Sequence, residues 1–250
     1  PGGSNGFQNQ EIEVFNNKMY FGGYDNTHGA ELWSSDGTED GTSIVKDIAT
    51  GTESSRPGNF TVFNDELFFI AGESYSEYGT EIWKTDGTEE GTSLLADINP
   101  NGSSVDVENT LFVEFGNRLY FGANDGESGL ELWSTDGTSA GTSQVFDLNP
   151  GSGNGLYFEG DFDYFDEEGI TPYPYLAVLN DKLIFNGNDG SGIGYELYAL
   201  SGDTTAPTLI SSTPADDALG IATNSDIVLN FSESVYVGSG IITLYKESDN

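Results

Sequence analysis

Short runs of alternating apolar and polar residues recur along residues 7–202, and tight turns separate them. Four pairs of runs are joined by two residues each, namely Asn16-Asn17, Asn64-Asp65, Gly116-Asn117 and Asn180-Asp181. Alternation with a period of two is typical of β-strands with one buried face. Two-residue loops of Asn, Asp and Gly favour type I′ turns, which need positive φ at both central residues. The pattern therefore predicts four β-hairpins.

A third apolar run follows each hairpin. It reads ELWSS, EIWKT, ELWST and, less regularly, ELYAL, so that Trp33, Trp83, Trp133 and Tyr198 share one position. Large aromatic side chains in the middle of a strand favour packing in a core. We expect them to pack between neighbouring repeats; a platform on which a ligand stacks is the alternative.

The sequence DGTxxGT follows the third run in the first three repeats, beginning at Asp36, Asp86 and Asp136. An Asp side chain accepts hydrogen bonds from backbone N–H groups two residues on, and glycine supplies positive φ, so the pattern predicts a turn. A fourth run then reads TSIVKDI, TSLLADI or TSQVFDL. Each of these three repeats thus contains four predicted strands.

Four strands repeated in tandem predict an all-β chain that forms a β-propeller-like array of four-stranded blades. The repeats cover approximately residues 7–51, 58–101, 109–152 and 174–202. One such sheet cannot bury both of its faces alone, so neighbouring repeats are expected to stack. An open β-solenoid is the alternative architecture.

The three close copies, Glu31 to Thr38, Glu81 to Thr88 and Glu131 to Thr138, resemble the ELWxxDGT repeat proteins of bacteria. The fourth copy departs from them: Tyr198 replaces Trp, LSGD stands in place of the DGT turn, and we expect an upstream strand outside this sequence to complete it. The resemblance implies a propeller-like repeat in large secreted or surface proteins. It implies no reaction and no catalytic residue.

Residues 203–206 read as a short linker, and strand-like runs alternate with turns over residues 207–250. This last segment resembles bacterial Ig-like domains of S-layer and other surface proteins. The matching residues are Pro207, Pro214, Ala215, Asp216, Phe231, Ser232 and Glu233. The resemblance implies a truncated Ig-like β-sandwich, since a whole one has about 100 residues, and a role as a spacer.

The most informative feature of the composition is its strongly negative net charge. The chain of 250 residues carries 42 acidic and 7 basic side chains, a formal net charge of −35. Phosphate and anionic membranes both attract basic surfaces, so we expect neither nucleic acid binding nor membrane insertion. The absence of Cys and the single His, His28, disfavour thiolate chemistry, Cys-type zinc sites and a Ser-His-Asp triad.

Acidic loops between the second and third strands are the first candidate binding sites. In three repeats the loop holds an Asp and precedes the Glu of the third strand, which gives the pairs Asp25 and Glu31, Asp125 and Glu131, and Asp189 and Glu196. Carboxylate and carbonyl oxygens are the ligands that Ca²⁺ prefers. The sequence therefore predicts calcium sites, and a loop stabilised by its own Asp side chain is the alternative.

An insertion in the fourth repeat, Gly153–Tyr175, is the second candidate. It brings together several acidic residues, among them Asp161, Asp163 and Asp166. Such a cluster repels itself unless it is solvated or holds a cation, so calcium and a plain solvated loop both fit. Paired carboxylates would also suit a glycosidase, but no other feature of the sequence supports one.

Together these features predict a non-catalytic structural or adhesive module of a large secreted or cell-surface bacterial protein, stabilised by Ca²⁺. The expected partner is a glycan or protein at a cell surface, or other copies of the chain in an extracellular assembly, with many weak sites adding up through avidity. The alternative is a polysaccharide-acting enzyme or a glycan-binding lectin built on a propeller.

Overall fold

The computed structural model describes residues 7–72, 79–106, 110–156, 176–202, 208–214 and 226–231, of which residues 7–10 by their backbone alone. Every regular secondary-structure element in these ranges is a β-strand, as predicted. No helix long and apolar enough to cross a membrane occurs among these residues. The chain divides into two compact parts, Pro1–Gly202 and Asp203–Asn250.

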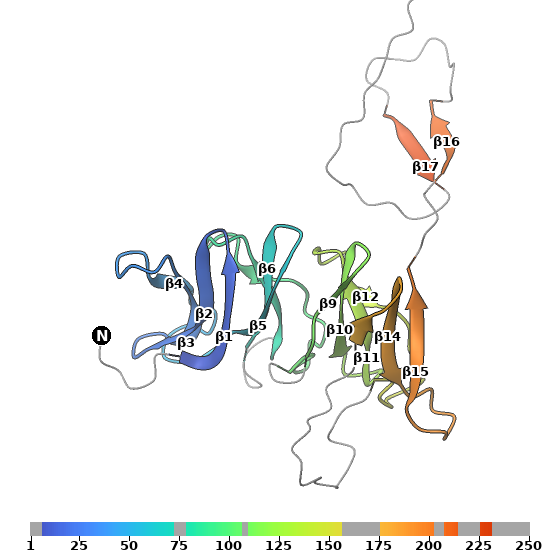
Figure 1. The fold of residues 1–250 in the computed structure, drawn as a ribbon, viewed down its shortest axis with the longest axis horizontal. Helices are drawn as coiled ribbons and strands as arrows, with labels where there is room; N and C mark the ends of the chain where they lie inside the picture. Colours follow the sequence, from blue (N-terminus) through green and yellow to red (C-terminus); the bar gives the residue numbers. More distant parts are fainter. Residues whose placement is uncertain are drawn as a thin grey trace, which may run out of the picture. The chain divides into compact units, whose positions relative to one another are not determined.

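Each of the first three repeats forms a four-stranded antiparallel sheet whose strands follow one another in sequence order (Figure 1). The first sheet comprises β1 (Phe7–Phe15), β2 (Lys18–Asp25), β3 (Gly29–Ser35) and β4 (Ser43–Lys46). The second comprises β5 (Gly58–Phe63), β6 (Glu66–Ala71), β7 (Glu81–Thr85) and β8 (Ser93–Leu94). The third comprises β9 (Val113–Phe115), β10 (Arg118–Asn124), β11 (Leu130–Thr135) and β12 (Ser143–Gln144).

The fourth repeat forms a three-stranded sheet of β13 (Leu176–Val178), β14 (Lys182–Gly187) and β15 (Glu196–Ser201). In the C-terminal part, β16 (Leu209–Thr213) pairs antiparallel with β17 (Val228–Phe231), and Thr213 lies opposite Val228. These two strands coincide with two of the predicted runs of the Ig-like segment.

The hairpin turns follow the prediction in three of four repeats. Both central residues have positive φ at Asn16-Asn17, Asn64-Asp65 and Asn180-Asp181, as a type I′ turn requires. In the third repeat only Gly116 has positive φ, at 61°, and Asn117 does not. The prediction of type I′ was therefore wrong there, because glycine at the first position gives the φ pattern of a type II′ turn.

Neighbouring sheets bury apolar faces against each other. Phe15, Tyr20 and Leu32 of the first sheet share one core with Leu67 and Phe69 of the second. Equivalent cores lie between the second and third sheets and between the third and fourth. The first strands of successive sheets also lie side by side, β1 beside β5 and β9 beside β13. This is the packing of a propeller-like array, in which each sheet depends on its neighbours.

The repeated aromatic residues of the third strand lie at these interfaces. Trp83 and Trp133 are half-buried against the first and second cores, and Tyr198 is half-buried against the third. Within the fourth sheet, the rings of Tyr198 and its cross-strand neighbour Phe185 stack with their centroids 5.7 Å apart. The expected packing between repeats is confirmed for these three residues, although none of them is fully enclosed.

Candidate functional site

In the part of the chain that the structure describes, the Glu of the third strand is the buried charged group of each of the first three repeats. Strand β3 carries Glu31 into the interior, where it has no solvent exposure. Its oxygens accept hydrogen bonds from the N–H of Ile48 at 2.8 Å and from the N–H and hydroxyl of Ser55 at 2.8 and 2.6 Å. A carboxylate can accept all three because it offers two oxygens with free lone pairs.

The same arrangement recurs in the next two repeats, and we call it the glutamate clamp. Glu81 is also fully buried and accepts from the N–H of Ile98 and from the N–H and hydroxyl of Ser104. Glu131, equally buried, accepts from the N–H groups of Leu148 and Asn149 at 3.0 and 3.4 Å.

The third clamp differs because Gly155 takes the place of the serine. A Cβ on Gly155 would come within 2.1 Å of Glu131 Oε2, so this packing leaves no room for a side chain.

The clamp joins two sheets through a single residue of the linker. The N–H of Ser55 also donates to the carbonyl of Ala30 at the start of β3, and the carbonyl of Ser55 accepts from Gly72 at the end of β6. Ser104 makes the equivalent bonds to Thr80 and Asn124. One residue thus bridges the third strand of one repeat and the second strand of the next, and the buried carboxylate holds it there.

Burial changes the proton affinity of these carboxylates. Loss of solvent raises the pKa of Glu31 and of Glu81 to about 7, because the surrounding donors only partly replace water around the charge. The pKa of Glu131 is raised by the same burial.

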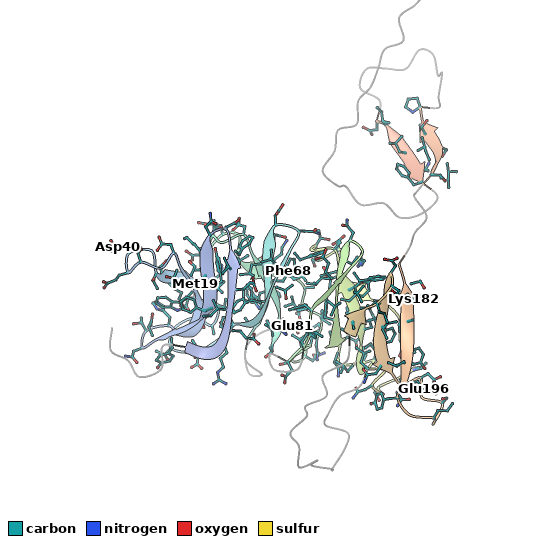
Figure 2. All side chains as sticks on the ribbon, in the orientation of Figure 1. Met19, Asp40, Phe68, Glu81, Lys182 and Glu196 are labelled. Atoms are coloured by element: carbon teal, nitrogen blue, oxygen red, sulfur yellow. The ribbon has the colours of Figure 1, made fainter. Side chains whose placement is uncertain are left out.

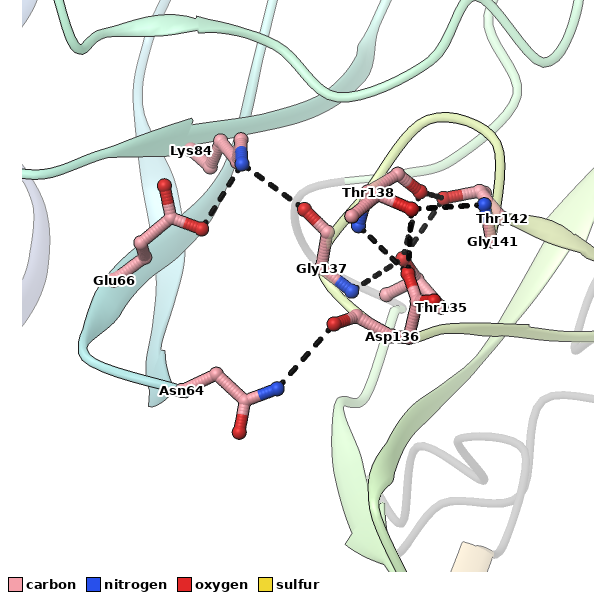
Figure 3. A network of polar contacts seen from close by, with 9 residues as sticks. All are labelled: Asn64, Glu66, Lys84, Thr135, Asp136, Gly137, Thr138, Gly141 and Thr142. Atoms are coloured by element: carbon pink, nitrogen blue, oxygen red, sulfur yellow. Dashed lines mark hydrogen bonds and ion pairs between the residues drawn. The ribbon is translucent and has the colours of Figure 1, made fainter. Parts of the chain in front are cut away.

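The DGTxxGT segment forms the turn that the sequence predicts, with its own hydrogen-bond network (Figure 3). Asp136 Oδ1 accepts from the N–H and hydroxyl of Thr138 at 2.9 and 2.7 Å, and the hydroxyl of Thr138 accepts from the N–H of Gly141 at 3.0 Å. Thr142 Oγ1 then donates to the carbonyl of Thr138 at 2.7 Å. The first two repeats show the same Asp–Thr–Gly bonds.

The turns of the second and third repeats also contact the preceding repeat. Figure 3 shows Asn64 Nδ2 donating to the carbonyl of Asp136 at 3.3 Å and Lys84 Nζ donating to the carbonyl of Gly137 at 3.0 Å. Lys84 also pairs with Glu66 at 2.9 Å. The turn therefore has two roles, one inside its own repeat and one at the interface.

The predicted calcium ligands of the loops bond to groups of their own loops. Asp25 Oδ1 accepts from the N–H groups of Thr27 and His28 at 2.7 and 2.8 Å, and its Oδ2 lies 2.8 Å from His28 Nδ1. The hydrogen bond from His28 lowers the pKa of Asp25. Asp125 accepts from the N–H groups of Glu127 and Ser128.

In the fourth repeat, Asp189 accepts from the N–H of Ser191 at 2.9 Å, and the bonds from Ser191 lower the pKa of Asp189. Glu196, which was paired with it in the prediction, is exposed. Asp161, Asp163 and Asp166 lie outside the described residues.

The structure separates the two members of each predicted pair in the first and third repeats. Asp25 and Asp125 bond within exposed loops, whereas Glu31 and Glu131 bond to the linker inside the protein. Among the residues that the structure describes, no group of three or more acidic or histidine side chains is arranged to hold a metal ion. Calcium binding by this chain stays a prediction.

Sequence reasoning missed Ser55 and Ser104 and left Glu81 out of the candidates. The signal lay in spacing, since the Glu and its serine partner are 24 residues apart in the first repeat and 23 in the second. Glu81 was not among the candidates because the loop before it lacks the Asp that the corresponding loops of the other repeats contain.

Comparison with known proteins supports the prediction for the C-terminal part of the chain. Residues 203–249 match the family of bacterial Ig-like domains. This match confirms the resemblance for the C-terminal segment. No curated protein sequence matches the chain significantly. The likeness of the repeats to ELWxxDGT proteins stays a resemblance.

Several solved structures are similar to the chain at low identity. They include Xyloglucan PUL GH43B of Bacteroides ovatus (12% identity, TM-score 0.36, covering 75% of this chain and 37% of that one) and an endo-arabinase of Bacteroides thetaiotaomicron (13%, 0.33, 92% and 94%). An α-L-arabinofuranosidase of Clostridium thermocellum is 13% identical, with a TM-score of 0.32, and the match covers 70% of this chain and 59% of that one. The chain thus spans well under half of the first of these structures. The likeness concerns the propeller-like fold alone.

Proposed function

We propose that this chain is a non-catalytic structural and adhesive module of a secreted or cell-surface bacterial protein, built on ELWxxDGT-type repeats. The repeats form a rigid stack that presents its loops to a glycan, to a protein at a cell surface, or to other copies of the chain. The Ig-like segment is a spacer, as the surface-protein resemblance of its family implies.

The observation that carries the proposal is the glutamate clamp. Enzymes that use carboxylates expose them to substrate in a cleft, whereas Glu31, Glu81 and Glu131 are fully buried and bonded to the linkers. The Asp of each DGT turn is likewise bonded within its own turn. The repeated carboxylates therefore serve the stack, which is what a structural module requires of its repeated residues.

The test is to measure binding and turnover on the same polysaccharides. The full chain would be incubated with arabinan, xyloglucan and a panel of surface glycans, with released reducing ends and retained polymer as readouts. We expect retention on one or more polymers without release of sugar. Release of sugar that grows with time and protein concentration would favour the alternative, a polysaccharide-acting enzyme.

Calcium stabilisation belongs to the same proposal, with Asp25, Asp125 and Asp189 as the loop ligands. A bound ion stabilises the folded state by RT ln(1 + [L]/Kd), so a specific site raises the melting temperature at low calcium concentration. The measurement compares CaCl₂ with MgCl₂ at fixed ionic strength. Equal shifts from both salts would argue against the loops as calcium sites and would favour plain screening of the acidic surface.

A further inference from the structure

The fourth repeat leaves open the sheet face that every earlier repeat buries. Leu197 follows the Glu of the third strand and is 78% exposed, whereas Leu32, Ile82 and Leu132 at the same position are fully buried. Leu179 precedes the hairpin turn and is 60% exposed, whereas Phe15, Phe63 and Phe115 at that position are buried. In each earlier repeat the next sheet covers this face, so we call it the leading face.

The first repeat leaves open the opposite face, which we call the trailing face. Met19 is 38% exposed, whereas Leu67, Leu119 and Leu183 at the same position are fully buried against the repeat before them. Ile12 is 48% exposed, whereas Phe112 and Leu176 at its position are buried. The described part of the stack therefore ends in two different apolar faces.

The close contacts between a turn and the preceding repeat at the internal interfaces indicate how these two faces fit together. A Cβ on Gly87 would lie 2.5 Å from the hydroxyl of Tyr20, and one on Gly137 would lie 3.5 Å from Phe68, because these turns press on the preceding repeat. Gly37 is the equivalent glycine of the first repeat, and a Cβ added there would have no neighbouring atom within 4 Å. The DGT turn of the first repeat is thus free to contact a leading face.

The fourth repeat offers the matching donor. Asn64 donates its side-chain amide to the turn of the following repeat, and Asn180 occupies the same place in the hairpin of the fourth repeat. Asn180 has the same positive φ as Asn64, at 49° and 50°, so the backbone presents both side chains from the same kind of turn. Asn180 is exposed.

From these features we propose that two copies of the chain associate head to tail, with the trailing face of one copy packed on the leading face of the other. The apolar part of the contact repeats the packing that the chain already forms three times between its own sheets, and the Asn contact repeats the bond between Asn64 and Asp136. Asn180 donates to the carbonyl of Asp36, and Leu179 and Leu197 become buried. The proposal rests on the proposed structural function and names one of its partners, a second copy.

Within one copy the two faces belong to opposite ends of the row of sheets, with Met19 on the first sheet and Lys182 and Glu196 on the fourth (Figure 2). The contact is heterologous, because different surfaces of the two copies meet. Such contacts build a closed ring where the rotation closes and an open filament where it does not.

The net charge of −35 opposes this association, because both copies carry it. Added salt screens the repulsion, with a Debye length of about 8 Å at physiological ionic strength and about 3 Å at 1 M. The contact itself is mostly apolar, so we expect association to strengthen as salt is raised.

The experiment uses sedimentation velocity of the full chain over a wide range of concentration, at moderate and high salt, together with two variants. Met19→Asp blocks the trailing face and Leu197→Asp blocks the leading face. Both sites are exposed in the single copy, so each variant is expected to fold, which tryptophan fluorescence checks. Val62→Asp, at a position also exposed inside the stack, is the control that keeps the association of the unmodified chain.

The expected result is asymmetric. The unmodified chain and Val62→Asp grow in mass with concentration, and each face variant alone stays monomeric. An equimolar mixture of the two face variants forms a dimer and stops there, because only one intact pair of faces remains. Association of Met19→Asp with itself would overturn the proposal, since it would show contact between like faces.

A second readout follows the same face directly, because Met19 is the only methionine of the chain. Oxidation of Met19 by peroxide, measured by mass spectrometry, should slow by roughly tenfold when about nine-tenths of the trailing faces are occupied. In Leu197→Asp it should stay fast. A chain that is monomeric at every concentration, with Met19 either oxidised quickly or protected by its own chain, would overturn the proposal. Neither result would bear on glycan retention, which tests the proposed function separately.

Discussion

The second and fourth repeats place a glutamate and the branched aliphatic residue that follows it in opposite environments. Glu81 and Ile82 are fully buried, whereas Glu196 and Leu197 begin an equivalent strand and are exposed. The local sequences, EIWKT and ELYAL, and the antiparallel pairing with the strand before them are alike. What differs is the linker and the sheet that cover the second repeat, so burial in this fold is conferred by the following repeat.

The largest expected effect comes from removing the clamp carboxylate. Glu81→Ala leaves the N–H of Ile98 and the hydroxyl of Ser104 without their acceptor, and the N–H of Ser104 keeps only its bond to the carbonyl of Thr80. Unsatisfied buried donors cost about 1–3 kcal/mol each, partly recovered where water enters. We expect a loss of about 3 kcal/mol in the free energy of unfolding, measured by urea denaturation. Tryptophan fluorescence reports this transition, since all three Trp lie in the repeats.

Glu196→Ala is the matched control, because the same residue type at the same position is exposed there. It should change the free energy of unfolding by no more than about 0.5 kcal/mol. If the two variants lost similar stability, the clamp would not be what distinguishes the second repeat from the fourth.

A smaller effect is expected from the second glycine of the DGT turn. A Cβ at Gly91 would come within 2.0 Å of Asp86 Oδ1, which already accepts two bonds from Thr88. Gly91→Ala must displace that carboxylate, and forced packing of this kind costs about 1–3 kcal/mol. We expect about 2 kcal/mol in the same denaturation experiment.

The comparison glycine is Gly102 in the linker. There a Cβ would have its nearest neighbour, Asn99 Nδ2, at an ordinary 3.6 Å, and φ is not positive. Gly102→Ala should therefore leave stability nearly unchanged or raise it slightly. A Gly102→Ala variant as unstable as Gly91→Ala would mean that glycine flexibility, and not the room beside Asp86, decides the cost.

The contrast between repeats also explains which features could be predicted from the sequence and which could not. Hairpins and DGT turns depend on residues within about seven positions, such as Asp86 with Thr88, so their patterns predicted them. The burial of Glu81 depends on Ser104, 23 residues away, and on a sheet formed by a different repeat. No local pattern distinguishes such a carboxylate from an exposed metal ligand, which is why Glu31 and Glu131 were proposed as calcium ligands.

The fourth strands show the same limit on a smaller scale. The run TSLLADI predicts a strand of several residues, but β8 comprises only Ser93–Leu94. Further along the run, the N–H of Ile98 donates to Glu81 and is therefore not available for a ladder with another strand. The last residue of the run therefore bonds to the clamp and not to the sheet.

A further expected effect is a dependence of stability on pH. Burial raises the pKa of Glu31 and Glu81 to about 7 from an ordinary value of 4.5. Between these values the folded chain holds protons that the unfolded chain has released, so the free energy of unfolding should fall as pH rises from about 4.5 to 7 and then level off. The loop carboxylates act in the opposite sense below this window. Hydrogen bonds lower the pKa of Asp25, Asp36 and Asp86, so their contribution is present above the ordinary value of 3.8 and is lost as pH falls from there through the lowered pKa of the folded state.

Urea denaturation at a series of pH values checks this dependence, and the comparison of repeats isolates its source. Glu81→Gln cannot titrate, so its stability should fall less steeply over the same window than that of the unmodified chain. Glu196→Gln is the matched variant, because it makes the same change at the equivalent, exposed position of the fourth repeat. His28 also contributes, since its bond to Asp25 raises its pKa and adds a loss of stability above 6.5; it is present in all three chains and so cancels in the comparison. If stability depended equally on pH in the two Gln variants, the groups that titrate between about pH 4.5 and 7 would lie outside the clamp. The buried carboxylates would then already be ionised at the lower end of this range.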